Sequence, residues 1–170
     1  SMELVRDLYV FCCFTGLSFT DMKNLTKDNV QTSFDGKLWI MTKRQKTGVE
    51  SNIMLMDIPL RLIEKYDGMA KENYLLPVPQ YITACKNLKT IIGLCGIEKN
   101  ITWHTSRHTM ATEICLTNGV PIETLSKMLG HTNIRTTPIY AKITHEKESR
   151  DMNSLSDKLS RIEQFSGITI

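Results

Sequence analysis

The sequence of 170 residues lacks the features of several protein classes. It has no apolar run of 18 residues and no signal-peptide pattern, so neither a membrane span nor secretion is predicted. Its five cysteines are odd in number and form no Cys-x-x-Cys pair, which disfavours a disulfide framework or a zinc knuckle. We interpret them as buried thiols in a reducing cytoplasm. Without internal repeats or low-complexity segments, residues 1–170 are predicted to form one domain.

A large excess of charge of one sign is also missing. The net charge is only +3, with 41% hydrophobic and 23% charged residues, which is ordinary for a soluble globular domain. The positive sign favours a polyanionic partner without requiring one. The placement of the charge is more informative, because Lys43, Arg44 and Lys46 crowd one predicted turn.

Apolar residues recur at helical spacing along most of the chain. Ser18 and Asp21 have the spacing of a capping box, which predicts a short helix after them. Glycines such as Gly16, Gly96 and Gly119 follow other apolar stretches and are typical helix ends. The predicted helices are 3–15, 19–25, 60–66, 81–95, 104–118 and 121–129. In 81–95, the apolar face is expected to consist of Ile82, Cys85, Leu88, Ile92 and Cys95.

Two short stretches have the pattern of β-strands. Residues 37–41 follow an Asp35-Gly36 turn, and residues 52–58 alternate well enough to form the returning strand after Thr47-Gly48. Pro59 is expected at the start of the next helix. The predicted fold class is therefore α+β, mostly α, with one small antiparallel sheet.

The tail, residues 146–170, has a narrow apolar stripe on an otherwise charged and serine-rich helix. Met152, Leu155, Leu159 and Ile162 lie at helical spacing. The pattern predicts one amphipathic C-terminal helix, which docks either on its own domain or on a neighbouring subunit.

A group of reactive side chains lies between Trp103 and Tyr140. His104 and His108 have the spacing of a helical zinc pair, but Thr105 stands where a zinc protease has its glutamate, and no third ligand is near in sequence. A metal site is therefore disfavoured. His104 and Arg107 are three residues apart, so they share one face at a helix start.

The order of these motifs resembles the catalytic domain of the tyrosine recombinases, the phage-integrase family. His104-x-x-Arg107 opens a helix, Leu129-Gly130-His131 follows, and Tyr140 comes nine residues after His131. Lys46, in the predicted β-turn, lies far upstream. The stretch 15–18, Thr-Gly-Leu-Ser, also resembles the first conserved box of the family. The resemblance covers about residues 4–144.

The resemblance implies a role for each of these residues. Tyr140 matches the nucleophile that attacks a DNA phosphodiester and forms a 3′-phosphotyrosyl link, with no metal or nucleotide cofactor. His104 matches the residue that accepts the proton of the tyrosine hydroxyl or orients the phosphate. His131 matches a residue that donates a hydrogen bond to the phosphate. Arg107 offers a planar fork to the phosphate oxygens. Lys46 matches the lysine that protonates the leaving 5′ oxygen.

One position departs from the family pattern. The first box normally reads Thr-Gly-Leu-Arg, and its arginine is a second phosphate clamp, whereas this chain has Ser18. Either the domain is catalytically dead and only binds DNA, or another cation takes the place. We favour Arg44, because it lies two residues before Lys46, and in a strand both side chains would point to the same face.

The resemblance also implies the partners. Double-stranded DNA is the expected substrate, bound by a homotetramer, with no small-molecule substrate and no membrane. N-terminal DNA-binding domains are expected to be absent here, with Ser1 and Met2 a cloning scar. The first-box variant favours an integrase of a bacterial mobile element, acting in the cytoplasm at the nucleoid. The expected phosphate contacts are Lys43, Lys86, Lys89, Arg135 and Lys142.

Three other interpretations stay open. A type IB topoisomerase would use similar chemistry without a specific site or a tetramer. An inactive relative would bind DNA without covalent attachment. A metalloprotein built on His104 and His108 would contain zinc.

Overall fold

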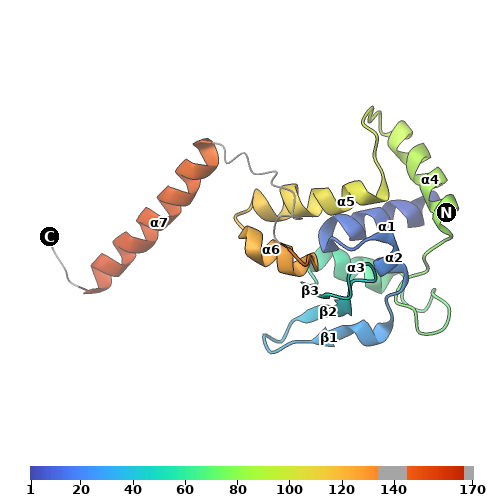
Figure 1. Ribbon diagram of the computed structural model, residues 1–170, viewed down its shortest axis with the longest axis horizontal. Helices are drawn as coiled ribbons and strands as arrows, with labels where there is room; N and C mark the ends of the chain where they lie inside the picture. The colour runs from blue at the N-terminus through green and yellow to red at the C-terminus, as the bar shows by residue number, and fades with distance from the viewer. Residues whose placement is uncertain (134–144, 167–170) are drawn as a thin grey trace. The chain divides into compact units, whose positions relative to one another are not determined.

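The computed structural model describes residues 1–133 and 145–166 (Figure 1). The chain divides near residue 138 into two units. The first contains the sheet and most of the helices, and the second contains the C-terminal helix α7 (His145–Ser166).

Helix α1 (Met2–Thr15) forms the centre of the first unit. Val5, Leu8 and Phe11 lie on its buried face, at most 1% exposed, because apolar residues three and four apart share one side of a helix. α1 packs against α3 (Asp57–Lys65), α4 (Tyr81–Leu94) and α5 (Trp103–Thr109), and also against the π-helical stretch that continues α5. The further helices are α2 (Phe19–Lys23), a 3₁₀ turn (Lys27–Asn29), a π-helical stretch (Met110–Leu116) and α6 (Ile122–Met128).

The sheet has three antiparallel strands in the order β1-β2-β3. They are β1 (Val30–Thr32), β2 (Leu38–Lys43) and β3 (Glu50–Met54). Ile40 pairs with Ile53, and both are at most 1% exposed, so these central residues fix the inward face of the sheet. α6 packs against β3, which brings the segment after α6 to the hairpin between β2 and β3 (Figure 1).

The predicted class, mostly α with a small antiparallel sheet, is confirmed, but several details were wrong. The short strand β1 was not predicted. β3 ends at Met54, so the end of the predicted strand 52–58 belongs to α3, in which Pro59 is the third residue. The predicted helix 104–118 is α-helical only to Thr109 and continues as a π-helix.

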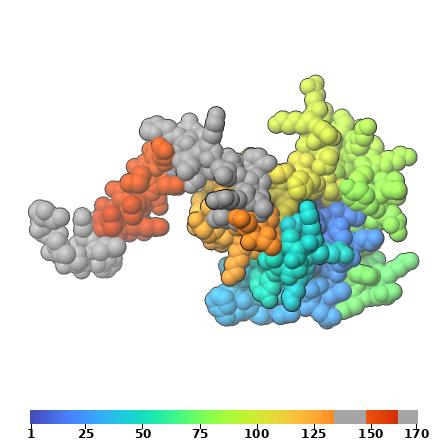
Figure 2. Space-filling view, viewed as in Figure 1, coloured from blue at the N-terminus to red at the C-terminus, as the bar shows by residue number. Residues whose placement is uncertain are grey.

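The predicted apolar face of α4 was wrong at both ends. Ile82 is 84% exposed and Cys95 is exposed, whereas Ala84 and Leu88 are buried. Hydrophobic spacing shows which side chains share a helix face, but not how far the neighbouring elements extend to cover it. In Figures 1 and 2, α4 and the loop that follows it stand at one end of the first unit.

The predicted C-terminal helix is confirmed as α7. Met152, Leu155 and Leu159 are 46–62% exposed, and the side chain of Ile162 lies outside the described residues. Whether this stripe docks on its own domain or on another subunit stays a prediction. None of the helices in the described part of the chain is long and apolar enough to cross a membrane.

Candidate active site

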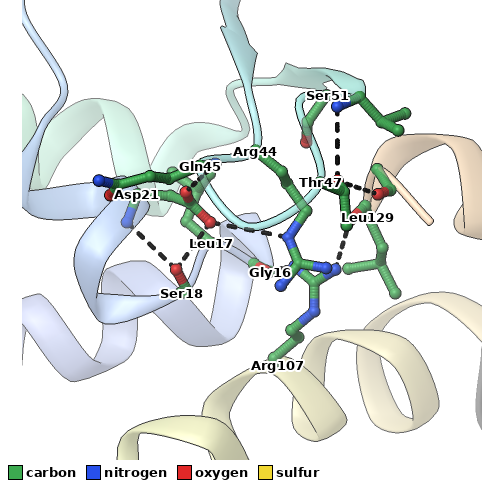
Figure 3. Close-up of polar contacts among 12 residues, drawn as sticks. Gly16, Leu17, Ser18, Asp21, Arg44, Gln45, Thr47, Ser51, Arg107 and Leu129 are labelled. Atoms are coloured by element: carbon green, nitrogen blue, oxygen red, sulfur yellow. Dashed lines mark hydrogen bonds and ion pairs between the residues drawn. The ribbon is translucent and has the colours of Figure 1, made fainter. Parts of the chain in front are cut away.

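Four segments distant in sequence meet at one place in the first unit. They are the start of α2, the turn between β2 and β3, helix α5, and the segment that follows α6 (Figure 3). Gly16, at the end of α1, makes the close approach possible. Its φ is +68°, and a Cβ there would lie 2.7 Å from a methyl carbon of Leu129. The Thr-Gly-Leu-Ser box therefore turns directly beneath the segment after α6.

Arg107 is the buried anchor of the site. It is 6% exposed, and its Nη1 donates a hydrogen bond to the Gly16 carbonyl at 2.5 Å, while Nη2 donates to the Leu129 carbonyl. Burial, and then the nearby positive charge of Arg44, lower the pKa of Arg107 to about 10. The guanidinium thus remains charged at neutral pH, and two backbone carbonyls hold its plane in one orientation.

Arg44 lies beside Arg107, although it comes from the hairpin turn (Figure 3). Its side chain is only 13% exposed, and its Nε lies 3.8 Å from Asp21 Oδ2, too far for a hydrogen bond. This Nε is buried and has no hydrogen-bond partner among the described residues. A buried N–H without an acceptor is costly, so Arg44 is arranged for an acceptor that the described chain does not supply.

Gly130 creates the space for Arg44. A Cβ on Gly130 would lie 2.9 Å from Arg44 Cγ and 3.0 Å from Arg44 Cδ, and its φ is +60°. The aliphatic part of Arg44 therefore packs directly on the backbone of the Leu-Gly-His motif. Any side chain at position 130 would displace the arginine.

Ser18 does not point toward the arginines but holds Asp21. Its hydroxyl donates to Asp21 Oδ2 at 2.6 Å and accepts from the Asp21 backbone N–H at 3.1 Å, which caps α2 as predicted. The other carboxylate oxygen of Asp21 accepts a hydrogen bond from the Gln45 backbone N–H at 2.9 Å. Asp21, 4% exposed in its side chain, thereby ties the hairpin turn to α2.

The opposite side of the hairpin is tied to the end of α6. Thr47 Oγ1 donates to the Gly130 carbonyl at 3.2 Å, and Ser51 Oγ donates to the Met128 carbonyl at 2.5 Å. The turn that carries Lys46 is therefore held from two sides. Lys46 itself is exposed at the tip.

The two predicted catalytic histidines are both neutral at pH 7. Burial lowers the pKa of His104, as do the charges of His108 and Arg107. Burial, Arg107 and Arg44 lower the pKa of His131 to about 4. His131 Nε2 lies 3.1 Å from Arg107 Nη2. Since an arginine N–H can only donate, Nε2 is the acceptor, and the ring proton is on Nδ1.

The structure brings some of the predicted residues together and not others. Arg44, Arg107 and His131 meet in the buried cluster. Lys46 lies near enough to His104 for its positive charge to lower the pKa of His104, and both residues are exposed at the edge of the cluster. The predicted phosphate contacts Lys43, Lys86 and Lys89 are exposed on β2 and α4. Tyr140, Arg135 and Lys142 lie outside the described residues.

Two corrections concern the hairpin. β2 ends at Lys43, so Arg44 and Lys46 lie on the turn, and the argument from strand alternation was wrong. Arg44 points inward because Gly130 and Asp21 receive it there, while Lys46 remains exposed. Asp21 has a second role that was not predicted, because it also holds the hairpin turn. Its capping-box spacing revealed the contact with Ser18, but no sequence signal revealed the contact with Gln45.

A hollow of about 390 Å³ opens beside the cluster, which we call the catalytic hollow. It is lined by Ser18 and Lys23, by His104 and Arg107, and by the aromatic rings of Phe19, Tyr81 and Trp103. Phe19 contacts both other rings edge to face, at centroid distances of 5.0 and 4.8 Å. The rings of His104 and His108 lie 4.6 Å apart, but no group of three potential metal ligands occurs in residues 1–133 or 145–166.

The site is therefore rich in cations and hydrogen-bond donors, with Asp21 as the carboxylate closest to Arg44. Two guanidinium groups can bind two oxygens of one phosphate, and the neutral imidazoles can accept or donate a proton. These properties match a site for a tetrahedral anion.

Comparison with known proteins agrees with this geometry. The model of the phage integrase family matches residues 5–147. A tyrosine recombinase of Pseudothermotoga lettingae is 29% identical over 163 residues, which cover 89% of this chain and 53% of that protein. The tyrosine recombinase XerD of Lacticaseibacillus casei is 44% identical over 61 residues, which cover 36% of this chain and 20% of XerD. This chain thus spans about half, or less, of these relatives.

Solved structures share the fold. XerA recombinase superposes with a TM-score of 0.65 at 20% identity, covering 92% of this chain and 64% of XerA. The catalytic domain of bacteriophage HP1 integrase superposes with a TM-score of 0.60 at 22% identity, covering 88% of this chain and 82% of the HP1 domain. The integrase of transposon Tn1549, solved with transposon right end DNA, superposes with a TM-score of 0.63 at 18% identity. The match covers 88% of this chain and 58% of that integrase.

Proposed function

Because this chain belongs to the phage integrase family, we propose that it is the catalytic part of a site-specific DNA recombinase, an integrase of a bacterial mobile element. It cuts and rejoins DNA strands through a 3′-phosphotyrosyl link at Tyr140. Two neighbours in fold were solved with DNA, the Tn1549 integrase with transposon DNA and XerH with its palindromic difH substrate, which supports double-stranded DNA as the substrate.

The convergence of Arg44 and Arg107 is the observation that carries this proposal. The two guanidinium groups lie together, and the buried Nε of Arg44 lacks an acceptor among the described residues. A phosphodiester has two non-bridging oxygens, on which negative charge grows in the transition state. Fixed guanidinium donors stabilise that charge, because they need no reorganisation as the reaction proceeds.

The proposed reaction is a transesterification. The hydroxyl oxygen of Tyr140 attacks the phosphorus, a new O–P bond forms, and the bond from phosphorus to the 5′ oxygen breaks. The tyrosine loses its proton to neutral His104, directly or through water, and Lys46 gives a proton to the leaving oxygen. A 5′-hydroxyl of another strand reverses the step. Since one phosphate ester replaces another, the bond energy is conserved and the reaction needs no nucleotide cofactor.

Arg44 takes the place of the arginine that is missing at Ser18. It approaches the cluster from the hairpin instead of from α2, and its aliphatic part rests on Gly130. Ser18 contributes indirectly, because it holds Asp21, which in turn holds the turn at Gln45. His131 contributes a neutral N–H donor to the phosphate. A second arginine in the cluster favours an active enzyme over an inactive DNA-binding relative.

The wider surface and the assembly are also part of the proposal. Lys43, Lys86 and Lys89, with Arg135 and Lys142 outside the described residues, contact phosphates of the duplex. Four copies assemble on DNA. The apolar stripe of α7 is covered either by its own domain or by a neighbouring copy, because burial of apolar surface is stabilising. The protein acts in the bacterial cytoplasm, at the nucleoid, without a small-molecule substrate.

Covalent trapping tests the proposal. The protein is mixed with a nicked DNA that carries its site, so that the cut end diffuses away and the link cannot be reversed. We expect a protein–DNA band that resists SDS for the wild type and no band for Tyr140→Phe, which removes only the attacking oxygen. Site binding without a band for the wild type would instead identify an inactive DNA-binding relative.

A further inference from the structure

A second hollow adjoins the catalytic hollow. It has a volume of about 340 Å³ and is lined by Lys23, Met69, Lys71, Tyr74 and residues 76–78. Lys23, the last residue of α2, lines both hollows, and none of their other described lining residues is shared. Lys23 therefore lies between the buried arginine cluster and the second hollow.

The loop that forms the second hollow is tied to the segment after α2. The Leu75 backbone N–H donates to the Leu25 carbonyl at 2.9 Å, and the Lys27 backbone N–H donates to the Asn73 carbonyl at 2.9 Å. The Lys27 ammonium also contacts Asp67 at 2.8 Å. These bonds hold the backbone of the loop, and with it Lys71 and Tyr74, next to the segment that follows α2.

The chemistry of both hollows favours an anion with apolar parts. Among the described residues, no carboxylate lines either hollow, whereas Lys23, Lys71 and Arg107 do. Each hollow also has one exposed aromatic ring, Tyr74 at 41% and Tyr81 at 55% exposure. Such rings offer an apolar face and a hydroxyl to sugars and bases. A small anion would fill one hollow, but a chain of phosphates can cross from one to the other.

We propose that the DNA strand leaves the catalytic hollow over Lys23 and enters the second hollow. Lys23 and Lys71 bind the phosphates next to the one that is cut, and so hold the strand in line with the arginine cluster. The inference rests on the proposed function, in that the catalytic hollow receives the phosphate that is cut. These contacts position the duplex and do not read its sequence.

The salt dependence of DNA binding tests the two lysines independently of cleavage. A plot of log affinity against log salt has a negative slope, and each lost phosphate contact makes this slope shallower by about 0.9 for duplex DNA. We therefore expect a decrease of about 0.9 for Lys23→Ala, and of about 1.8 for Lys23→Ala combined with Lys71→Ala. Lys23→Arg keeps the charge and should keep the slope of the wild type.

Lys37→Ala is the matched control. Lys37 is an exposed lysine before β2 and lines neither hollow. Thermal unfolding of each variant separates lost contacts from lost structure. If Lys23→Ala and Lys37→Ala have the same slope, or if Lys23→Arg loses as much as Lys23→Ala, the inference is wrong.

Neutral phosphates locate the contact along the strand. In the trapped covalent complex the tyrosine link marks the cut phosphate, and single methylphosphonates are then placed at successive flanking positions. One flanking methylphosphonate should weaken binding of the wild type and have no further effect on Lys23→Ala. Equal weakening in both proteins would overturn the assignment. A changed slope without any trapped complex would support the lysine contacts while rejecting strand cutting.

Discussion

Two clusters of buried charge in this domain are built in opposite ways. Between α1 and α3, one carboxylate has three donors, since Asp7 accepts from Arg6 at 2.8 Å, from Lys65 at 2.6 Å and from Tyr66 at 2.8 Å. In the candidate active site, Arg44 and Arg107 lie together, and among the described residues the carboxylate nearest to Arg44 is that of Asp21, at 3.8 Å, beyond hydrogen-bond distance. The first cluster is complete without a ligand, whereas in the second the buried Nε of Arg44 has no acceptor within residues 1–133 and 145–166.

This difference separates a structural charge from a functional one. A protein gains stability when a buried charge has all its hydrogen bonds, and it loses stability when it buries two like charges together. The loss of stability from burying Arg44 and Arg107 together is explained if a phosphate binds between them during the reaction. Substitutions in the arginine cluster should therefore lower the cleavage rate, whereas substitutions in the Asp7 cluster should lower stability.

The largest effect is expected for Arg107→Lys. A lysine cannot reach the Gly16 and Leu129 carbonyls and also present two donors to one phosphate. The rate of cleavage should fall by about 10²- to 10³-fold, the usual loss for one fixed transition-state donor. Single-turnover cleavage at saturating protein measures this, with Lys37→Arg as a control for a neutral exchange of cations. A wild-type rate for Arg107→Lys would contradict the assignment.

Asp7→Asn should affect stability and leave the chemistry intact. The carboxylate is 5% exposed and accepts three hydrogen bonds, but Arg6 and Lys65 are partly exposed and can be solvated again. We expect a loss of about 1.5–3 kcal/mol in the free energy of unfolding, measured with urea at pH 7. Asp67→Asn, which removes the exposed pair with Lys27, should cost much less, because solvent screens an exposed ion pair. Equal losses in the two variants would show that burial does not distinguish them.

The stabilisation by Asp7 should also depend on pH. Burial raises its pKa, but the hydrogen bonds from Lys65, Arg6 and Tyr66 outweigh burial, so the pKa in the folded protein is lowered. The stabilisation is therefore complete above the unfolded value of about 3.9 and is lost as the pH falls through the lower folded pKa. The stability difference between the wild type and Asp7→Asn should shrink below pH 4. A difference that grows on acidification would contradict the sign of the shift.

Ser18→Ala should have the smallest effect among the substitutions at the two clusters. It removes the cap of α2 and the hydrogen bond to Asp21, which should cost about 1 kcal/mol of stability. Ser18→Thr keeps the hydroxyl and is the control. If Ser18 acted directly on the phosphate, Ser18→Ala would instead lower the cleavage rate at saturating DNA as strongly as Arg107→Lys.

Local features of the fold could be predicted from the sequence, since they depend on neighbouring residues. Ser18 caps α2, Gly16 ends α1, and Ile40 and Ile53 lie on the inward face of the hairpin, because caps, left-handed turns and strand alternation are local. The contact between Arg107 and His131 was not predicted, since the resemblance to the family only assigned both residues to the phosphate. Spacing alone showed no contact between residues 24 positions apart.

The rest depends on contacts between distant parts of the chain. Arg44 turns inward because Gly130 leaves room for it, and those residues are brought together only when α6 packs on β3. Asp21 was predicted only as part of a capping box. Its contact with the Gln45 backbone was missed, because a hydrogen bond between residues far apart in the chain leaves no pattern in the sequence. The exposure of Ile82 was missed for the same reason, since a helix pattern does not reveal where its neighbours end.

Covalent trapping by Arg44→Ala tests the central claim most directly, namely that a hairpin arginine completes the phosphate clamp. The account predicts that Arg44→Ala still binds DNA but forms the covalent complex about 10²- to 10³-fold more slowly than the wild type. Adding Ser18→Arg to this variant should restore part of the rate, because position 18 also lines the catalytic hollow. Trapping by Arg44→Ala at the wild-type rate would contradict the account.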